Sequence, residues 1–303
     1  MVNRSCHATV YAVPDRLAML QYLETHASTI YAIAFIGVMI GVVFWEVQAP
    51  RRQQIVSHWV RWFSNFGVYV LNTFILHLLL PLSAIALAAA MVEHSWGLIN
   101  NVSAPVSIAI AGSILMLDGL HYLKHIVLHK IPLFWRFHRV HHTDLDFDFT
   151  TGIRFHPFES IVTALTTMVA IAVLGISVAA VVIFETSLVV VTFIVHGNVR
   201  YPASLDNVFR TLLVTPDMHR IHHSARASET DSNYGVIFSW WDRLFGTHVA
   251  QPLNGHEGMS LGLLEFRDSK HQTLPWMLAC PFLDTARYQT SAEQEDVTLK
   301  VQE

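Results

Sequence analysis

Histidines gather in three short clusters whose spacing could bind metal ions. These are His125 and His129 in HIVLH, His138, His141 and His142 in HRVHH, and His219, His222 and His223 in HRIHH. On a helix, residues three or four positions apart share one face, so each cluster would present two or three imidazoles in one direction. Imidazole is the commonest metal ligand near neutral pH. Because one zinc ion takes only three or four protein ligands, these clusters predict two metal ions.

The composition places these histidines in a membrane protein. Of 303 residues, 52% are hydrophobic and 14% are charged, against about 25% charged residues in typical soluble domains. The mean hydropathy is +0.40. A net charge of −4 offers no basic surface, so no nucleic acid partner is expected. The two cysteines, Cys6 and Cys280, are too few for a disulfide framework or a Cys-rich metal site.

Long apolar runs supply the elements that must position the clusters. Three runs are long enough to cross a bilayer, which takes about 20 residues. They are Ser28–Val47, Gly67–Val92 and Ala104–Val127. A fourth apolar region, Phe158–Val195, is longer and is interrupted near Gly175, which predicts a hairpin of two helices, Phe158–Leu174 and Ser177–Val199. We expect an all-α fold, a multi-pass membrane helical bundle with a cytoplasmic helical cap that carries a His-rich di-metal site.

Basic residues predict the orientation of this bundle. Arg51, Arg52 and Arg61 follow the first apolar run, whereas the turn 93–103 and the hairpin tip near Gly175 contain no lysine or arginine. Cytoplasmic loops carry an excess of these residues. We therefore expect both charge-poor turns outside and all three histidine clusters on the cytoplasmic side.

The chain divides into three predicted parts. These are an N-terminal segment (1–27), a transmembrane domain (28–255) and a polar C-terminal tail (256–303) with a short amphipathic piece at Leu274–Leu283. Within the domain, one helix should end near Lys130, and another should begin near Leu133 and carry the second cluster. The acidic stretch Asp144–Asp148 should follow as a loop.

The chemistry fits oxidation of a lipid. A cage built only from imidazoles is neutral, so it leaves the metal charge uncancelled and favours an electron-poor, oxidising centre. Polar groups at the membrane are costly and are functional by default. Metals at the membrane surface, above an apolar slot between helices, could reach the C–H bonds of a molecule dissolved in the bilayer.

The clusters and their surroundings resemble the fatty acid hydroxylase superfamily. The resemblance rests on DGLHYLKHIVLHKIPLFWRFHRVHH from Asp118, TTGIRFHP, HGNVRYP at His196, TPDMHRIHHS, and NYGVIFSWWDRLFGT ending at Thr247. More narrowly, the chain is similar to bacterial members of the sterol desaturase family, and its third cluster to the alkylglycerol monooxygenases. The resemblance implies a non-haem di-iron oxygenase of the bacterial inner membrane that hydroxylates or desaturates lipids with O2 and external electrons.

The resemblance also implies a ligand set. The family's H-x-x-x-H pair precedes the second cluster by nine residues and matches His125 and His129, and the family's isolated histidine after the hairpin matches His196. With the second and third clusters, the implied metal ligands are His125, His129, His138, His141, His142, His196, His219, His222 and His223.

Four further residues are candidates for supporting roles. Asp118 could orient a ligating imidazole, or could be a polar residue near the membrane edge. His121 lies one turn before His125, so it should face the same way but lie deeper in the membrane than the metals. His156 could be a ligand, although a structural role against Glu159 or the loop fits better, and Asn198 could hold water or a ligand.

The cofactors and partners follow from the resemblance, and two alternatives stay open. We expect two iron ions, replaceable by zinc on overexpression. Because no nucleotide, flavin or haem motif is present, a separate protein of the cytochrome b5, ferredoxin or flavoprotein type would supply electrons. The alternatives are a His-rich metal transporter or sensor, and a non-catalytic family member that binds metal only for structure.

Overall fold

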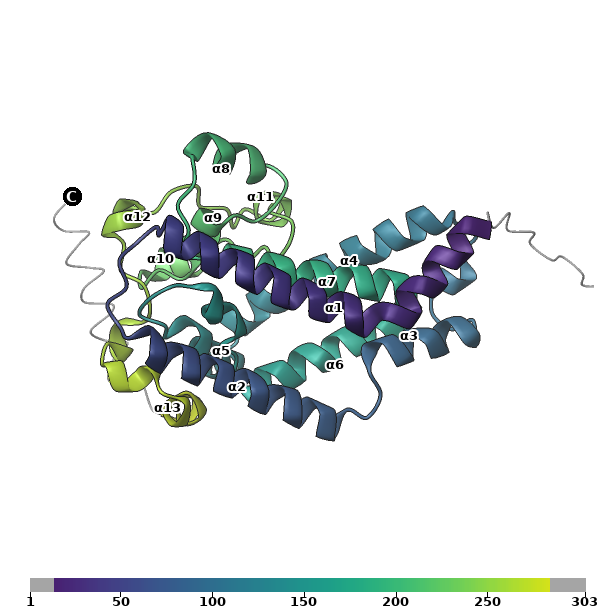
Figure 1. Ribbon diagram of the computed structural model, residues 1–303, viewed down its shortest axis with the longest axis horizontal. Coiled ribbons are helices and arrows are strands. Elements are labelled where there is room, and N and C mark those ends of the chain that lie inside the picture. The colour runs from purple at the N-terminus through teal and green to yellow at the C-terminus, as the bar shows by residue number, and fades with distance from the viewer. Residues whose placement is uncertain (1–13, 284–303) are drawn as a thin grey trace, which may run out of the picture.

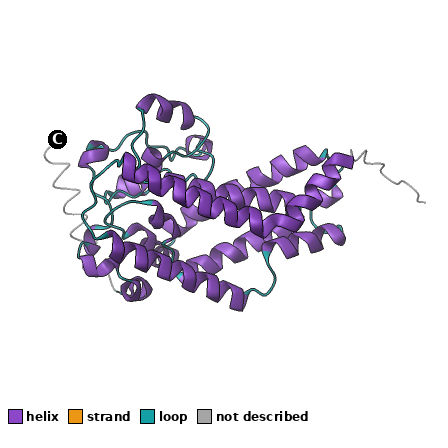
Figure 2. Cartoon of the chain, viewed as in Figure 1, coloured by secondary structure: helices purple, strands orange, loops and turns teal. Residues whose placement is uncertain are grey.

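The computed structural model describes residues 14–283 and consists of helices joined by loops (Figures 1 and 2). No β-strand occurs in this part of the chain. Long helices form one end of the molecule, and short helices gather at the other end (Figure 1). The all-α helical prediction is therefore confirmed.

The long helices include five stretches that are long and apolar enough to cross a membrane. The helices are α1 (Pro14–Gln48), α2 (His58–Leu79), α3 (Ala84–Glu93), α4 (Val106–Lys130), α6 (Pro157–Leu174) and α7 (Val178–Val195). The candidate spans are Thr25–Gln48, His58–Glu93, Val106–Lys130, Pro157–Leu174 and Val178–Val195. Large apolar side chains such as Ile33, Phe44 and Phe74 are exposed on these helices, as expected where they face lipid. The chain is a multi-pass membrane protein.

The apolar run Gly67–Val92 lies within one candidate span, His58–Glu93, but it forms two helices rather than one. Helix α2 begins nine residues earlier, at His58, and ends at Leu79, and α3 starts anew at Ala84. Pro81 lies between them, where its missing N–H and fixed φ stop the helix. Ser83 then caps α3, because its hydroxyl oxygen accepts a hydrogen bond from Ala86 N.

The hairpin prediction is confirmed, with a shorter second helix. Gly175 ends α6 in the left-handed conformation, at φ 70°, and Ser177 caps α7. Helix α7 ends at Val195, four residues before the predicted end. A Cβ on Gly97, itself at φ 90°, would lie 2.2 Å from Gly175 N, so the two charge-poor turns pack tightly together at the same end of the bundle.

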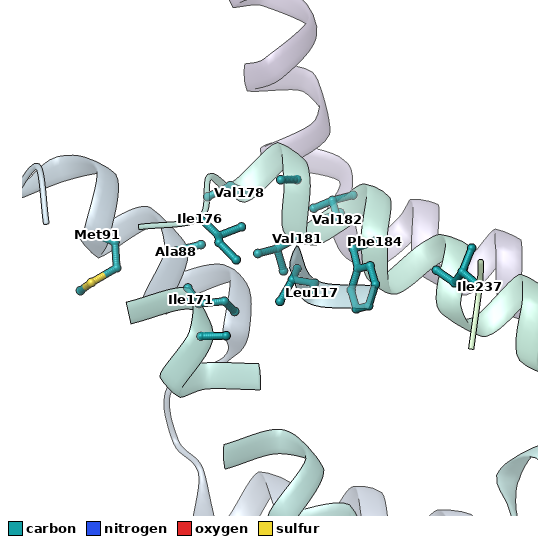
Figure 3. Close-up of a cluster of buried hydrophobic side chains, with 13 residues drawn as sticks. Ala88, Met91, Leu117, Ile171, Ile176, Val178, Val181, Val182, Phe184 and Ile237 are labelled. Atoms are coloured by element: carbon teal, nitrogen blue, oxygen red, sulfur yellow. The ribbon is translucent and has the colours of Figure 1, made fainter. Parts of the chain in front are cut away.

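A buried apolar cluster holds the bundle together. Helix α1 packs along α7, and α3 packs against both α6 and α7. Figure 3 shows side chains of α3, α4, α6 and α7 in this cluster, among them Ile171, Val181 and the fully buried Leu117 and Phe184. Ile237, from the short-helix end, joins the same cluster, so the two ends of the molecule share a core.

Short elements form the cap at the end of the molecule where α2 begins (Figure 1). The α-helices are α5 (Pro132–His142), α8 (Ala203–Phe209), α9 (Pro216–His222), α10 (Ala227–Thr230), α11 (Trp240–Leu244), α12 (Gly255–Gly258) and α13 (Leu274–Ala279). Short 3-10 turns accompany them: η2 (Phe149–Ile153), η3 (Leu264–Phe266), η4 (Ser269–Gln272) and η5 (Cys280–Phe282), with η1 (Ile99–Asn101) at the opposite end. Helix α5 carries the second cluster, and α13 with η5 covers the predicted amphipathic piece.

The described part of the predicted tail packs against the rest of the protein. Phe266, Met277 and Cys280 are buried in one apolar cluster with Val68 of α2 and Val140 of α5. The division into segments 1–27, 28–255 and 256–303 stays a prediction, and residues 1–13 and 284–303 lie outside the described residues.

The acidic loop after α5 is buried and anchored to α2. Both carboxylate oxygens of Asp144 accept hydrogen bonds from the Arg61 guanidinium, at 2.7 and 2.9 Å. Arg61 Nη1 also donates to Asp148 Oδ2, and the backbone N–H groups of Ile55 and Val56 donate to Asp146. These bonds fix the segment that directly follows the second histidine cluster.

Candidate metal centre

The fold brings all nine predicted ligand histidines together in the cap. His125 and His129 lie on α4, His138 to His142 on α5, and His219 and His222 on α9, while His196 and His223 directly follow α7 and α9. The structure sorts them into two buried groups in which the potential ligand atoms lie within 4.8 Å of one another. The larger group holds His125, His129, His138, His142 and His222; the smaller holds His141, His196, His219 and His223.

The two groups are interlocked through neighbouring residues. In the second cluster His142 faces the larger group and its neighbour His141 faces the smaller. In the third cluster His222 and His223 divide in the same way. The rings of His142 and His223 stack at 4.5 Å across the boundary. Each H-x-x-H-H cluster therefore contributes histidines to both groups.

Distances within each group suit shared coordination of one ion. His138 Nε2 lies 3.2 Å from both His125 Nε2 and His142 Nε2. In the smaller group, His196 Nε2 lies 3.2 Å from His141 Nε2 and 3.0 Å from His219 Nε2. Two nitrogens that each bind one metal at about 2.1 Å are roughly 3.0 to 3.4 Å apart. These spacings fit such a pair of ligands.

Buried imidazole nitrogens without partners support the same interpretation. Among the described residues, the Nε2 atoms of His129, His222 and His223 have no hydrogen-bond partner, although their surroundings exclude water. Leaving a buried polar atom unsatisfied costs about 1–3 kcal/mol. A metal ion would satisfy several of these atoms at once, so the donor set fits a metal centre.

Backbone carbonyls around the cage hold the Nδ1 atoms of three of these histidines. His125 Nδ1 lies 2.9 Å from Tyr234 O, and His222 Nδ1 lies 2.7 Å from Ser232 O. His196 Nδ1 lies 2.7 Å from Thr192 O. A carbonyl accepts only from a protonated nitrogen, so these contacts set the proton on Nδ1 and leave the Nε2 lone pair free for metal.

Two carboxylates support the larger group. Glu159 Oε1 lies 2.8 Å from His138 Nδ1, and both side chains are buried. Asp231 Oδ1 lies 3.3 Å from His129 Nδ1 and is itself bridged to Lys130. A carboxylate behind a ligating histidine fixes the ring and raises its basicity.

Burial keeps the cap imidazoles in the neutral form that binds metal. It lowers the pKa of His196 from its ordinary value of 6.5 to about 4, and that of His222 to about 3. Burial and neighbouring imidazoles also hold the pKa values of His141 and His223 well below 6.5. At neutral pH each of these rings is therefore neutral, with a proton on one nitrogen and a lone pair on the other.

Two of the candidate supporting residues lie on α4, outside both groups. His121 Nε2 lies 3.2 Å from the Thr167 hydroxyl, and its ring packs on Phe184. Asp118 accepts hydrogen bonds from Ile237 N and Trp241 Nε1. Asp118 thus fixes the loop that follows Tyr234, and its link to the cage runs through that loop.

The other two candidates, His156 and Asn198, form hydrogen bonds with backbone groups at or near helix ends. His156 caps α6, and its Nδ1 accepts a hydrogen bond from Phe158 N at 3.1 Å. Asn198 pairs with the backbone of Arg52 through both its side-chain oxygen and nitrogen. Their contacts therefore position α6 and the segment after α1.

Sequence reasoning missed Glu159, Asp231 and Tyr234 as partners of the cage. Glu159 had been considered only as a neighbour of His156. One signal was available: Glu159 is an acidic residue at the start of an apolar helix, where an ionisable group is expensive unless it has a partner. The carbonyl of Tyr234 gives no signal in a sequence, because every residue carries one.

The site is thus a histidine-rich candidate metal centre at one end of a membrane helical bundle. Residues 110–247 match the family model described as fatty acid hydroxylase. This region, which contains all nine histidines, belongs to the fatty acid hydroxylase superfamily.

Several known proteins are similar over the same region. Alkylglycerol monooxygenase of Caenorhabditis elegans is 29% identical over 44% of this chain and 26% of its own length. Ornithine lipid hydroxylase OlsE of Rhizobium tropici is 28% identical over 43% of this chain and 39% of its own length. Methylsterol monooxygenase 1 of Rattus norvegicus is 29% identical over 44% of this chain and 43% of its own length. The matches therefore span less than half of each of these relatives, and no solved structure matches the chain significantly.

Proposed function

We propose that this protein is a membrane-bound non-haem di-iron oxygenase that hydroxylates or desaturates a lipid with O2 and external electrons. The observation that carries the proposal is the pair of interlocked, all-imidazole groups beside lipid-exposed helices. The names of the similar proteins, all lipid monooxygenases or hydroxylases, support the reaction class.

The nine histidines would hold two iron ions, five around one and four around the other. Bound there, the iron pair would supply activation of O2 for removal of a hydrogen atom from an unactivated C–H bond. The neutral imidazoles leave the positive charge of the ions uncancelled, and Glu159 and Asp231 place partial compensation behind the larger group only. Zinc would replace iron on overexpression, since it binds nitrogen ligands more tightly.

The substrate would come from the bilayer, and the electrons from another protein. Helix α4 joins the two regions, because its apolar first half lies among the membrane helices and its last two turns carry His125 and His129. A sterol, a fatty acyl chain or an ether lipid would suit this setting. No nucleotide-binding motif occurs in the 303 residues, which favours a donor of the cytochrome b5, ferredoxin or flavoprotein type.

The test combines metal analysis with isotope labelling. The protein, His141→Ala and the control His94→Ala would be expressed in a host grown under 18O2, and membrane lipids would be compared by mass spectrometry. We expect two metals per chain in the unchanged protein and in His94→Ala, but not in His141→Ala. Only the strains that express these two proteins should contain a new lipid that carries 18O, or a new double bond without 18O. If the fully iron-loaded protein changes no lipid in any strain supplied with an electron donor, the oxygenase proposal is contradicted. The protein would then be a non-catalytic member that binds metal only for structure.

A further inference from the structure

The cap carries an exposed apolar surface that the metal centre does not use. Its members are Leu205, Val208 and Phe209 of α8, Leu212 just after it, and Leu244 and Phe245 of α11 and its end. Val208 is 65% exposed and Leu244 is 69% exposed. We name these six residues the α8–α11 face.

Contacts with α4 place α11 at the depth of the membrane helices. Trp241 Nε1 donates to Asp118 Oδ2 at 2.8 Å, and a Cβ on Gly119 would lie 3.1 Å from the Trp241 ring. The Phe245 ring stacks on Tyr122 at 5.5 Å. Asp118 lies twelve residues before Lys130, the end of a candidate span, which is about 18 Å along the helix axis.

The segment after α8 reaches the same depth. Val214 N donates to Ile237 O, and Leu213 forms a β-bridge with Phe238. Leu213 and Ile237 pack in the apolar cluster that contains Leu117 of α4. Both helices of the face are therefore tied to the bundle, not only to the cap, and both lie at the cap end of the molecule (Figure 1).

Charged side chains at α8 and α11 bond to groups of the protein itself. Arg210 donates to Ala250 O and pairs with Asp206, while Arg243 donates to Arg210 O and to the hydroxyl of Ser239. The side chains of Leu205, Val208, Phe209, Leu212, Leu244 and Phe245 are left on the outside. A short helix with bonded polar groups on one side and bare apolar groups on the other has the character of an interfacial element.

We propose that the α8–α11 face is an in-plane membrane anchor that lies at the headgroup–acyl boundary of the leaflet next to the metal centre. Lipid is the occupant because the face continues the lipid-exposed surface of α4, where Met116 and Leu123 are 40% and 51% exposed. Trp240 and the exposed end of Arg243 add the aromatic and basic groups that are enriched at such boundaries. The anchor does not depend on the proposed oxygenase activity.

The test measures which solvent touches the face. Single cysteines would replace Val208, Leu244 and, as a control, Ser228, in a Cys6→Ser background where the remaining Cys280 is buried. Ser228 is exposed on α10, close to Asp231 and the cage end of α4. Each protein, labelled with an environment-sensitive fluorophore, would be placed in nanodiscs of phosphatidylcholine and phosphatidylglycerol.

Two quenchers then separate the possible neighbours. We expect phosphatidylcholine with a nitroxide near the headgroup end of its acyl chain to quench labels at 208 and 244 at least threefold more than the label at 228, and aqueous iodide to show the opposite order. Equal iodide quenching at all three sites would overturn the proposal. Protection of 208 and 244 from both quenchers, with a dimer in mass measurements, would assign the face to a second copy and also overturn it.

Discussion

Single side chains around the cage should control how tightly it holds metal. Glu159 is buried, and its Oε1 contacts His138 Nδ1. We expect Glu159→Ala to weaken metal binding about 10- to 100-fold, the usual cost of losing such a partner. Glu159→Gln, which keeps an acceptor oxygen, should lose less. Competition with a fluorescent chelator measures this, with the exposed Glu257→Ala as the control; equal affinities in Glu159→Ala and the control would contradict the role.

The histidines of α4 should divide into ligands and a neighbour. His125 and His129 belong to the larger group, whereas His121 contacts Thr167 and Phe184. We expect His121→Ala to retain two metals per chain and most activity, and His125→Ala or His129→Ala to lose at least one metal and nearly all activity. Elemental analysis of the three purified variants measures the metal content per chain. Metal loss confined to His121→Ala would show that His125 and His129 are not the ligand pair.

At this scale the sequence predicted histidines well and their partners poorly. Spacing alone pointed to the three clusters, because helical periodicity turns i, i+3 and i+4 to one side. It could not show that neighbours such as His141 and His142 face different groups, which depends on the angle at which α5 meets α4 and α9. The carbonyl partners Tyr234 and Ser232 are invisible without the fold.

Among the elements, the loop after α5 depends on one buried arginine, Arg61, which pairs with Asp144 and Asp148. Arg61 and Asp144 are fully buried and joined by two hydrogen bonds. Removing one partner of a buried pair typically costs about 3–5 kcal/mol, so Arg61→Met should lower the melting temperature by on the order of 10 °C. Arg200→Met, at an exposed pair, should cost under about 1 kcal/mol. Thermal unfolding in detergent measures the melting temperatures of Arg61→Met and Arg200→Met. Equal melting temperatures would refute the role of Arg61 in anchoring the loop.

Helix ends were predictable where the chain carries a local signal. Gly175 and Ser177 mark the hairpin, and the structure places α6 and α7 on either side of them. Pro81 is also a local signal for a helix end, but the apolar residues on both sides of it form one continuous run, so the sequence did not predict the break between α2 and α3. The burial of Asp144 and Asp148 could not be predicted, because their partner Arg61 lies more than eighty residues earlier.

The whole molecule should have its charge-poor turns outside the cell and the metal centre inside. Basic residues cluster on the cap side of the chain, and the turns at Gly97 and Gly175 pack together at the other end. A cysteine at Ser103, exposed near those turns, should react with an impermeant maleimide in intact cells, and one at Ser228 should react only after lysis. The reverse pattern would invert the topology and place the cage outside.

The interlocked clusters have a consequence for how the protein acquires its metals. Each of the peptide bonds His141–His142 and His222–His223 joins a residue of one group to a residue of the other. An ion that settles in either group therefore also arranges ligands for the second ion, so the two binding events favour each other. During titration of apoprotein with Co²⁺, native mass spectrometry should show mainly empty and doubly loaded chains. Metal loading would then be cooperative, with few chains that hold only one ion at any point of the titration.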